Sequence, residues 1–150
     1  LPMAKLAEVL APYARGEESG EPLCRLRGTG ARKVPYLGYG EGAYLGRLVG
    51  VIVKQAAVPP QLDPIYETDM AEGLKAMALE GHGMAFLPAS SVKKELKSRR
   101  LVRAADAGQY EITMEVRIYR ERPELARHNK AGALALWEFL RSDAKRTSTG

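Results

Sequence analysis

The segment from 69 to 88 constrains the fold more than any other part of the chain, because it combines a helical period with a glycine stop. Asp69 occupies an N-cap position, and Glu72, three residues later, completes the pattern of a capping box. Gly81 can adopt the left-handed conformation that ends a helix. The pattern predicts a helix from about 70 to 80, with an apolar face made of Met70, Leu74, Met77 and Ala78.

A short apolar run follows this helix at 84–87 and ends at Pro88. An unbroken apolar run of this length is typical of a strand that is covered on both faces, as in a parallel sheet. No catalytic group is needed to explain the segment.

The same segment resembles the C-terminal half of the effector-binding domain of LysR-type transcriptional regulators. In that family a polar loop, a helix and a glycine-rich turn lead to a buried strand ending in Leu-Pro, then to a short helix and a Leu-Val strand. The matching pieces here are 67–72, 81–88, 90–97 and 100–102, in the same order and spacing.

Length and composition favour one soluble domain. A chain of 150 residues with 45% hydrophobic content can bury one core. The longest apolar stretch, 45–58, contains Arg47 and Lys54 and is too short to span a bilayer. No secretion signal is visible, although the chain begins at Leu1. Cys24 is the only cysteine, which is typical of a reducing compartment, so we expect a cytoplasmic protein with no membrane association.

The net charge of +5, from 23 basic and 18 acidic residues, invites a nucleic-acid interpretation. However, the basic residues form local clusters only at 93–94, 97–100 and 145–146, and no helix-turn-helix, zinc-finger or RNA-binding signature surrounds them. A solvated helix face is the favoured interpretation.

Strands and helices are predicted to alternate through the first two thirds of the chain. Strands are expected at 5–10, 34–37, 64–66 and 101–102, with a polar loop from Pro12 through 15–22. A glycine turn at 38–42 precedes a helix that begins at Ala43 and ends before Pro59. Ser90 or Ser91 caps a short helix. This alternation indicates an α/β fold with parallel pairing.

The pattern changes from Tyr110 onward. Apolar and polar residues alternate from Ile112 to Ile118, which predicts a strand with one solvated face. A polar loop from Pro123 to Lys130 leads into a last helix, and 142–150 is expected to be frayed. The buried face of that helix is predicted to contain Ala133, Leu136, Trp137 and Leu140.

The resemblance implies a fold class and a domain organisation. The fold would be a periplasmic-binding-protein-like (type 2) three-layer α/β sandwich. Residues 1–105 would form the second effector-binding subdomain, and 106–150 the returning strand and C-terminal helix of the first. DNA would be bound only through an N-terminal winged helix-turn-helix absent from this chain, which would therefore be a fragment. We expect a homo-oligomer, because the returning strand and helix would present apolar faces without their own subdomain.

The glycine loop is the main candidate site. Gly40, Gly42 and Gly46 resemble a dinucleotide fingerprint but give G-x-G-x-x-x-G, one residue too long, and no suitable acidic residue follows about twenty positions on. Free N–H groups at the start of the next helix could still hold an anionic group, although Glu41 would repel one. In the resembling family this loop and the one after the third strand line the cleft for a small-molecule effector. The predicted ligand-binding residues are Tyr39, Gly40, Glu41, Gly42, Ala43, Tyr44, Thr68, Asp69 and Phe86.

Simpler roles remain open for several of these residues. Thr68 and Asp69 could only cap a helix, and Phe86 could only fill the core. Met70, Met77 and Met84 are expected in the core, with an oxidant switch as the alternative for them and for Cys24.

No catalytic set is predicted. His82 and His128 belong to no nucleophile elbow and to no metal-binding cluster, so we expect no enzyme, no metal and no cofactor. A solute-binding protein of a transport system, which shares the architecture, and a small α/β enzyme are the competing functions.

Overall fold

The computed structural model describes residues 2–27, 32–120 and 131–147, with side chains from residue 7 to residue 143 within these ranges. The predicted loop at 123–130 lies outside them. The strands are β1 (Pro2–Arg15), β2 (Val34–Tyr39), β3 (Leu62–Thr68), β4 (Met84–Pro88), β5 (Leu101–Arg103) and β6 (Ile112–Tyr119). The helices are α1 (Tyr44–Gln55), α2 (Ala71–Leu79), the 3-10 turn η1 (Ala89–Val92), α3 (Lys93–Lys97) and α4 (Ala131–Thr147).

The chain divides into two units. The larger unit is Val9–Thr113, and the terminal unit combines Leu1–Glu8 with Met114–Gly150. Strands β1 and β6 pair with each other, and each passes from one unit into the other. The sequence places a boundary near residue 105 and groups the first residues with the larger unit, whereas here they group with the C-terminal segment. The assignment of the two parts to subdomains stays a prediction.

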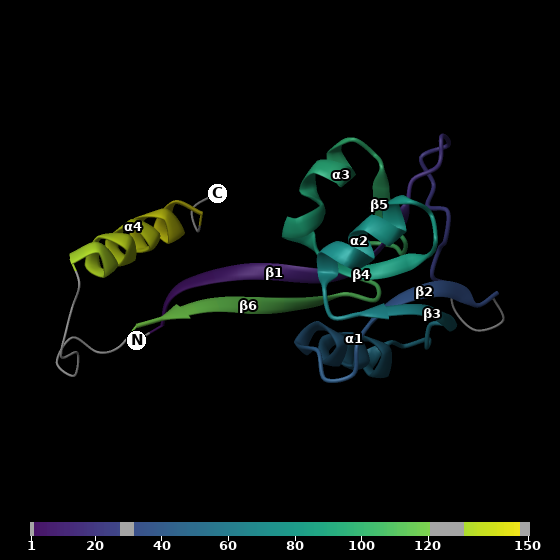
Figure 1. Cartoon of the computed structure of the whole chain (residues 1–150), viewed down its shortest axis with the longest axis horizontal. Helices are drawn as coiled ribbons and strands as arrows, with labels where there is room; N and C mark the ends of the chain where they lie inside the picture. Colours follow the sequence, from purple (N-terminus) through teal and green to yellow (C-terminus); the bar gives the residue numbers. More distant parts are fainter. Residues whose placement is uncertain (1, 28–31, 121–130, 148–150) are drawn as a thin grey trace. The chain divides into compact units, whose positions relative to one another are not determined.

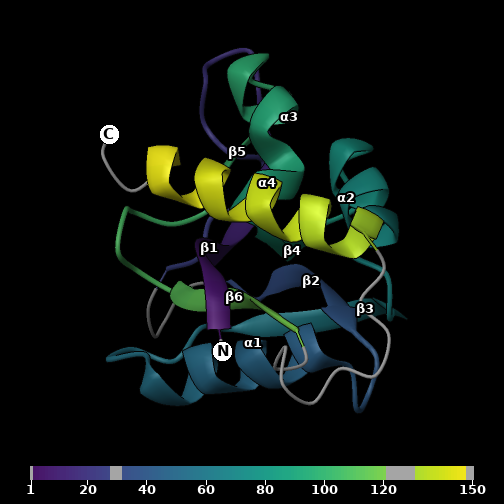
Figure 2. The ribbon, with the colours of Figure 1, turned by 90° about the vertical axis from the view of Figure 1, so that its left-hand side faces the viewer.

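The sheet of the larger unit mixes parallel and antiparallel pairs in the order β3-β2-β4-β1-β5. Strands β2, β3 and β4 are mutually parallel, as the alternation of strands and helices predicts. Strands β1 and β5 are not part of this parallel set, because β1 runs antiparallel to both β4 and β5. Helix α1 covers one face of the β2–β4 region, and α2 and α3 cover the other (Figures 1 and 2).

Strand β1 corrects the expected strand at 5–10, because it continues through Pro12 to Arg15. The carbonyl of Pro12 accepts a hydrogen bond from the Ala104 N–H at 3.0 Å, so the main-chain polar atoms of Pro12 face away from β4. The missing N–H of proline therefore removes no hydrogen bond from the β1–β4 ladder. Sequence reasoning treated Pro12 as a strand end, but a proline at this register is compatible with a strand.

Helix α1 forms as predicted. Its apolar positions recur with the helical period, and Val49 and Ile52 are buried against the sheet. The helix ends at Gln55, ahead of the Pro59-Pro60 pair that cannot continue it.

Helix α2 agrees with the prediction at its end and differs at its start. Gly81 has φ +84° and the His82 N–H donates to the Met77 carbonyl at 3.2 Å, which is the expected glycine stop. The capping box is wrong, because the N-cap residue is Met70 and no side chain caps the helix. Met70 is also 68% exposed and does not belong to the buried face, which contains Leu74 and Ala78.

Strand β4 is the centre of the core. Met84, Ala85, Phe86 and Leu87 have no exposed surface, as expected for a strand covered on both faces. Burying each large side chain of this kind contributes roughly 1.5–3 kcal/mol. The short helix after β4 has no side-chain cap, which corrects the role given to Ser90 or Ser91.

Helix α4 is less buried than its pattern suggests. Trp137 is 5% exposed, and Leu140 is half-buried, but Ala133 and Leu136 are exposed, contrary to the predicted face. The helix continues to Thr147, and the fraying expected at 142–150 stays a prediction. The period of two in β6 is confirmed only in part: Ile112, Met114 and Ile118 are half-buried, but Val116, at the same phase of the strand, is exposed.

Candidate functional site

The parallel strands end at one edge of the sheet, which we call the carboxyl edge. Tyr39, the last residue of β2, lies beside Thr68, the last residue of β3. From β2 the chain continues into α1 on one face of the sheet, and from β4 it continues into η1 and α3 on the other (Figures 1 and 2). Open α/β sheets bind ligands outside the carboxyl ends of adjacent strands whose connections diverge in this way. The loops after β2, β3 and β4 are therefore the candidate site.

Gly40 is the point where the first two loops come together. Its N–H donates to the Thr68 carbonyl at 3.2 Å, and a Cβ at this position would lie 2.1 Å from Oδ1 of Asp69. A side chain at this position would therefore require the Asp69 carboxylate to move. The loop then turns through Gly42, at φ +87°, and the Ala43 N–H donates to the Gly40 carbonyl at 3.1 Å. The structure thus brings the predicted residues of the β2 and β3 loops side by side.

Tyr39 and Phe86 lie beneath this edge. The Tyr39 hydroxyl donates a buried hydrogen bond of 2.7 Å to the Phe86 carbonyl, which ties β2 to β4. The Tyr36 ring packs edge-on against Phe86, with 6.1 Å between centroids. Burial raises the pKa of Tyr39 above its ordinary value and that of Tyr36 to about 12, so both phenols stay neutral. Phe86 has no exposed surface, in agreement with its core-filling alternative.

Two helices begin at the carboxyl edge without a side-chain cap. Ala43 is the N-cap residue of α1 and Met70 that of α2, and neither residue caps its helix with its own side chain. The Met70 N–H donates to the Thr68 hydroxyl at 3.5 Å. The first turn of α1 contains no acidic residue, and Tyr44 is 59% exposed. Main-chain N–H groups at such ends attract hydrogen-bond acceptors.

The side chains around this edge are acidic. Glu41, Glu67 and Asp69 are exposed, and Glu72 lies in the first turn of α2. A Cβ on Gly40 would lie 3.6 Å from a carboxylate oxygen of Glu67, so Glu67 and Asp69 flank the same glycine. The N-termini of α1 and α2 therefore attract hydrogen-bond acceptors, whereas the surrounding carboxylates repel acceptors that carry a negative charge.

Sequence reasoning missed the loop after β4. The Ser91 hydroxyl donates to the Pro88 carbonyl at 2.7 Å, and Lys75 Nζ donates to the Ser91 carbonyl at 3.1 Å. Lys75 also pairs with Glu72 at 3.0 Å and Glu95 at 3.4 Å, and the hydrogen bond with Glu72 is the main reason that its pKa is raised. The three-residue spacing of Glu72 and Lys75 is a sequence signal for an ion pair on one helix. Nothing in the sequence indicated that Glu95, from a later helix, also pairs with Lys75.

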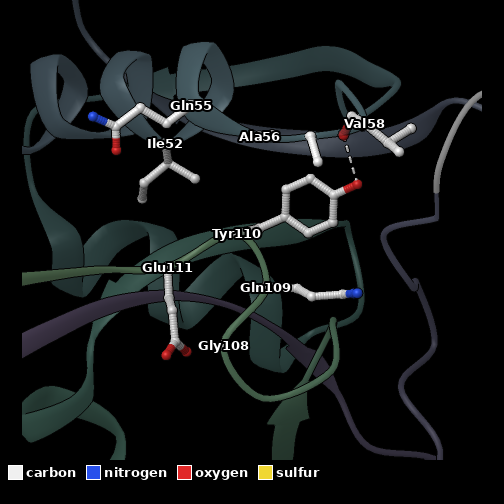
Figure 3. Close-up of a pocket in the computed structure, with 9 residues that line it drawn as sticks. Ile52, Gln55, Ala56, Val58, Gly108, Gln109, Tyr110 and Glu111 are labelled. Atoms are coloured by element: carbon white, nitrogen blue, oxygen red, sulfur yellow. Dashed lines mark hydrogen bonds between the residues drawn. The ribbon is translucent and has the colours of Figure 1, made fainter.

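A separate pocket of about 310 Å³ lies at the other end of α1 (Figure 3). The Tyr110 hydroxyl donates to the Val58 carbonyl at 2.8 Å, and Glu111 points away from that bond and pairs with Arg103. Ile52 adds an apolar wall. The Tyr110 hydroxyl is already hydrogen-bonded and the Glu111 carboxylate is paired with Arg103, so the side-chain amides of Gln55 and Gln109 are the remaining polar groups of this lining.

The described residues contain no group of three His, Cys, Asp or Glu side chains that could hold a metal. His82 is exposed, with Nε2 3.2 Å from Glu80, and His128 lies outside the described part of the chain. Burial raises the pKa of the Cys24 thiol, which disfavours the reactive thiolate. In the same described ranges, every helix is too short or too polar to cross a bilayer.

Curated proteins similar to this chain are transcriptional regulators. The HTH-type transcriptional regulator YjiE of Escherichia coli K12 is 31% identical over 94 residues, which are 62% of this chain and 29% of that protein. The HTH domain-truncated transcriptional regulator QseD of E. coli O157:H7 is also 31% identical over 94 residues and is covered to 37%. The chain thus spans well under half the length of these relatives.

Solved structures share the fold. HypT of Salmonella typhimurium, a hypochlorite-specific LysR-type regulator, superposes with a TM-score of 0.76 at 24% identity, over 97% of this chain and 47% of HypT. DarR of Vibrio fischeri, solved in complex with DNA, gives 0.77 at 26% identity, over 93% of this chain and 44% of DarR. These matches confirm the predicted periplasmic-binding-protein-like (type 2) fold class. The family described as LysR substrate binding domain matches residues 22–145, and the chain therefore belongs to that family.

Proposed function

We propose that this chain is the effector-binding part of a LysR-type transcriptional regulator and that a small molecule binds at the carboxyl edge. The main support is the close approach of the β2 and β3 loops at Gly40, where Asp69 occupies the space that any side chain would need. The loops after β2 and β4 leave toward opposite faces, which is where this class of sheet binds ligands.

The proposed contacts are the accessible members of the predicted set. Glu41, Gly42, Tyr44 and Asp69 are exposed, and Gly40 lies between the two loops. Tyr39 and Phe86 would support these loops from below through their buried hydrogen bond. The carboxylates at the edge favour an effector that is neutral or cationic and carries hydrogen-bond donors.

The wider role follows from the family. Binding would favour a closed arrangement of two subdomains and so change the arrangement of subunits and of DNA-binding modules outside this chain. The described residues offer no coherent acid, base and nucleophile set, so we propose binding without catalysis, in a cytoplasmic homo-oligomer. The relatives are transcriptional regulators, and a transport role is therefore not favoured.

Response to an oxidant is a second candidate. Met70 is 68% exposed beside Asp69, so its thioether is accessible to an oxidant at the proposed site. Met84 has no exposed surface and would be protected.

Thermal shift with three ligand panels tests the main proposal: organic amines, neutral polyols and di- or tricarboxylates. We expect stabilising ligands among the first two. Gly40→Ala should reduce the shift, because its Cβ would displace the Asp69 carboxylate from its place beside the β2 loop. Gly50→Ala is the matched control, since nothing lies within 4 Å of a Cβ at that exposed position on α1.

Circular dichroism establishes whether Gly40→Ala folds, and Tyr44→Ala, at an exposed position, provides a second variant. Retention of the full shift by both Gly40→Ala and Tyr44→Ala would place the ligand elsewhere. Turnover of a stabilising ligand would contradict the absence of catalysis.

A further inference from the structure

The run from Lys93 to Arg100 forms a basic surface of the larger unit. Its five cationic residues are all exposed, and they come from α3 and the turn that follows it. We call this surface the α3 basic face. It comprises Lys93, Lys94, Lys97, Arg99 and Arg100.

The one acidic residue in this run is mostly covered. Glu95 is 15% exposed and turns toward Lys75, with 3.4 Å between Oε1 and Nζ. None of the five cationic groups forms an ion pair with a carboxylate of the described residues. However, a hydrogen bond from its own backbone lowers the pKa of the Glu95 carboxyl, and Arg100 lies close enough to help lower it. The exposed charge of this run is therefore predominantly positive.

The backbone beneath these cations is held on both sides. The Arg100 N–H donates to the Glu95 carbonyl at 2.9 Å, and the Arg100 carbonyl accepts from the Gly16 N–H at 3.0 Å. Arg99 has φ +58°, and a Cβ on Gly16 would lie 2.3 Å from the Arg99 carbonyl oxygen. The two arginines are thus presented from a defined turn and not from a free loop.

A hollow of about 410 Å³ continues the face. It is lined by Arg99, Arg100 and Arg15, together with Glu17 and Glu18 on the preceding loop. Arg15 donates to the Glu80 carbonyl at 3.2 Å. Glu17 and Glu18 weaken the positive potential in this hollow. The binding surface therefore extends from Arg99 and Arg100 toward α3 and not into the hollow.

The face lacks the apolar centre of a protein-protein interface. Such interfaces bury aromatic or aliphatic side chains inside a polar rim. None of the exposed large hydrophobic residues of the described chain lies between 89 and 103. A surface of closely spaced cations without an apolar centre is the chemistry that binds a phosphate backbone.

The sequence favours a solvated helix face here and DNA contact only through a separate module; against that expectation, we propose that the α3 basic face binds the phosphate backbone of double-stranded DNA without regard to sequence. This contact lies outside the effector site. The proposal rests on the proposed function in one respect only, the choice of DNA over other polyanions as the ligand. The effector-binding domain would then contact DNA electrostatically, in addition to the DNA contacts made by a separate DNA-binding module.

Fluorescence anisotropy with a labelled random-sequence duplex of about 25 base pairs tests this contact. Five phosphate contacts predict that log K falls with log salt with a slope of about −4.5 between about 50 and 200 mM salt. Replacement of all five residues of the α3 basic face by Gln should weaken binding at least tenfold. The matched control removes the same charge at five other exposed positions: Arg27→Gln, Arg32→Gln, Lys33→Gln, Arg47→Gln and Lys54→Gln.

Three results would overturn the proposal: no binding by the wild-type chain at about 50 mM salt, an equal loss in the control variant, or binding of polyglutamate in preference to DNA. The last would indicate an acidic protein partner. The thermal-shift response to an effector, measured on the same variants, separates the two sites. DNA binding without any effector response would contradict the proposed function and leave this contact standing.

Discussion

The two units of the chain differ in how their apolar side chains are used. In the larger unit, Leu37, Leu74 and Phe86 have no exposed surface and form a continuous core around β4. In the described part of the terminal unit Trp137 is the buried large side chain, and even its indole Nε1 has no hydrogen-bond partner there. The exposed apolar residues of that unit are Val116, Tyr119, Leu134, Leu136 and Phe139.

A periodic pattern of apolar residues therefore predicts a helix or strand more reliably than it predicts whether the apolar face of that helix or strand is buried. Helices α2 and α4 both follow the helical period, but Leu74 is fully buried and Leu136 is 58% exposed. One contact of Trp137 is with a cation, since the Arg120 guanidinium lies 4.5 Å from its ring centroid. The terminal unit is therefore the part for which we expect a covering partner.

The free energy of unfolding should change most in a comparison of Leu74→Ala with Leu136→Ala. Leu74→Ala should lower the free energy of unfolding by about 2–5 kcal/mol, because it removes buried methyl groups and leaves a cavity. Leu136→Ala should cost less than about 0.5 kcal/mol in dilute solution, because the side chain is exposed. Urea unfolding followed by circular dichroism measures both. Equal losses would mean that Leu136 is covered and that the comparison is wrong.

Two glycines provide a smaller contrast. Gly81→Ala should destabilise the chain by about 1–2 kcal/mol, because φ is +84° and the added Cβ would lie 2.6 Å from Nη1 of Arg15. Gly132→Ala in α4 meets nothing within 4 Å and should be neutral or stabilising by up to about 1 kcal/mol. Thermal unfolding of the two variants measures the difference. A destabilised Gly132→Ala would indicate close packing at α4.

The exposed face of α4 predicts self-association. Leu136→Glu and Phe139→Glu should each weaken a dimer at least about tenfold, or ~1.4 kcal/mol, because they place a charge on the apolar contact. Ala57→Glu, at an exposed position of the larger unit, should leave association unchanged. Light scattering over a range of concentrations measures this. A wild-type chain that stays monomeric at every concentration would contradict the prediction.

The smallest expected effect concerns two methionines within the larger unit. Mild hypochlorite should oxidise Met70, which is 68% exposed, well before Met84, which is fully buried. Peptide mass spectrometry of the folded chain measures the order of modification, and Met70→Leu is the control for the response. If Met70 stays unmodified in the folded chain, the oxidant hypothesis fails.

Several elements were predictable because their signals are local. The glycine stop at Gly81, the buried run before Pro88 and the period of α1 each depend on residues a few positions apart, and all three are present. The capping box predicted at Asp69 is absent from the structure. The Asp69 carboxylate lies instead beside Gly40, a residue of another loop about thirty positions earlier in the chain.

The candidate site shows the same division. The pattern of glycines indicated the β2 loop, and the family resemblance implied the β3 loop. The structure brings Gly40, Thr68 and Asp69 together, and their role in ligand binding stays a prediction. The sequence did not indicate the loop at Ser91, because Lys75 reaches it from the preceding helix. The hydrogen bond between Tyr39 and Phe86 depends on the register of β2 against β4.

Local signals in the chain were enough to locate most helices and strands, because propensity, period and glycine conformation act over one or two turns of chain; the extent of β1 beyond Pro12 was an exception. Only the tertiary structure decided which residues share a surface. It placed Asp69 at Gly40, turned Glu95 inward to Lys75, and left Leu136 exposed. The physical reason is that burial and charge pairing depend on side chains brought together from distant positions, and these contacts form only when the sheet assembles.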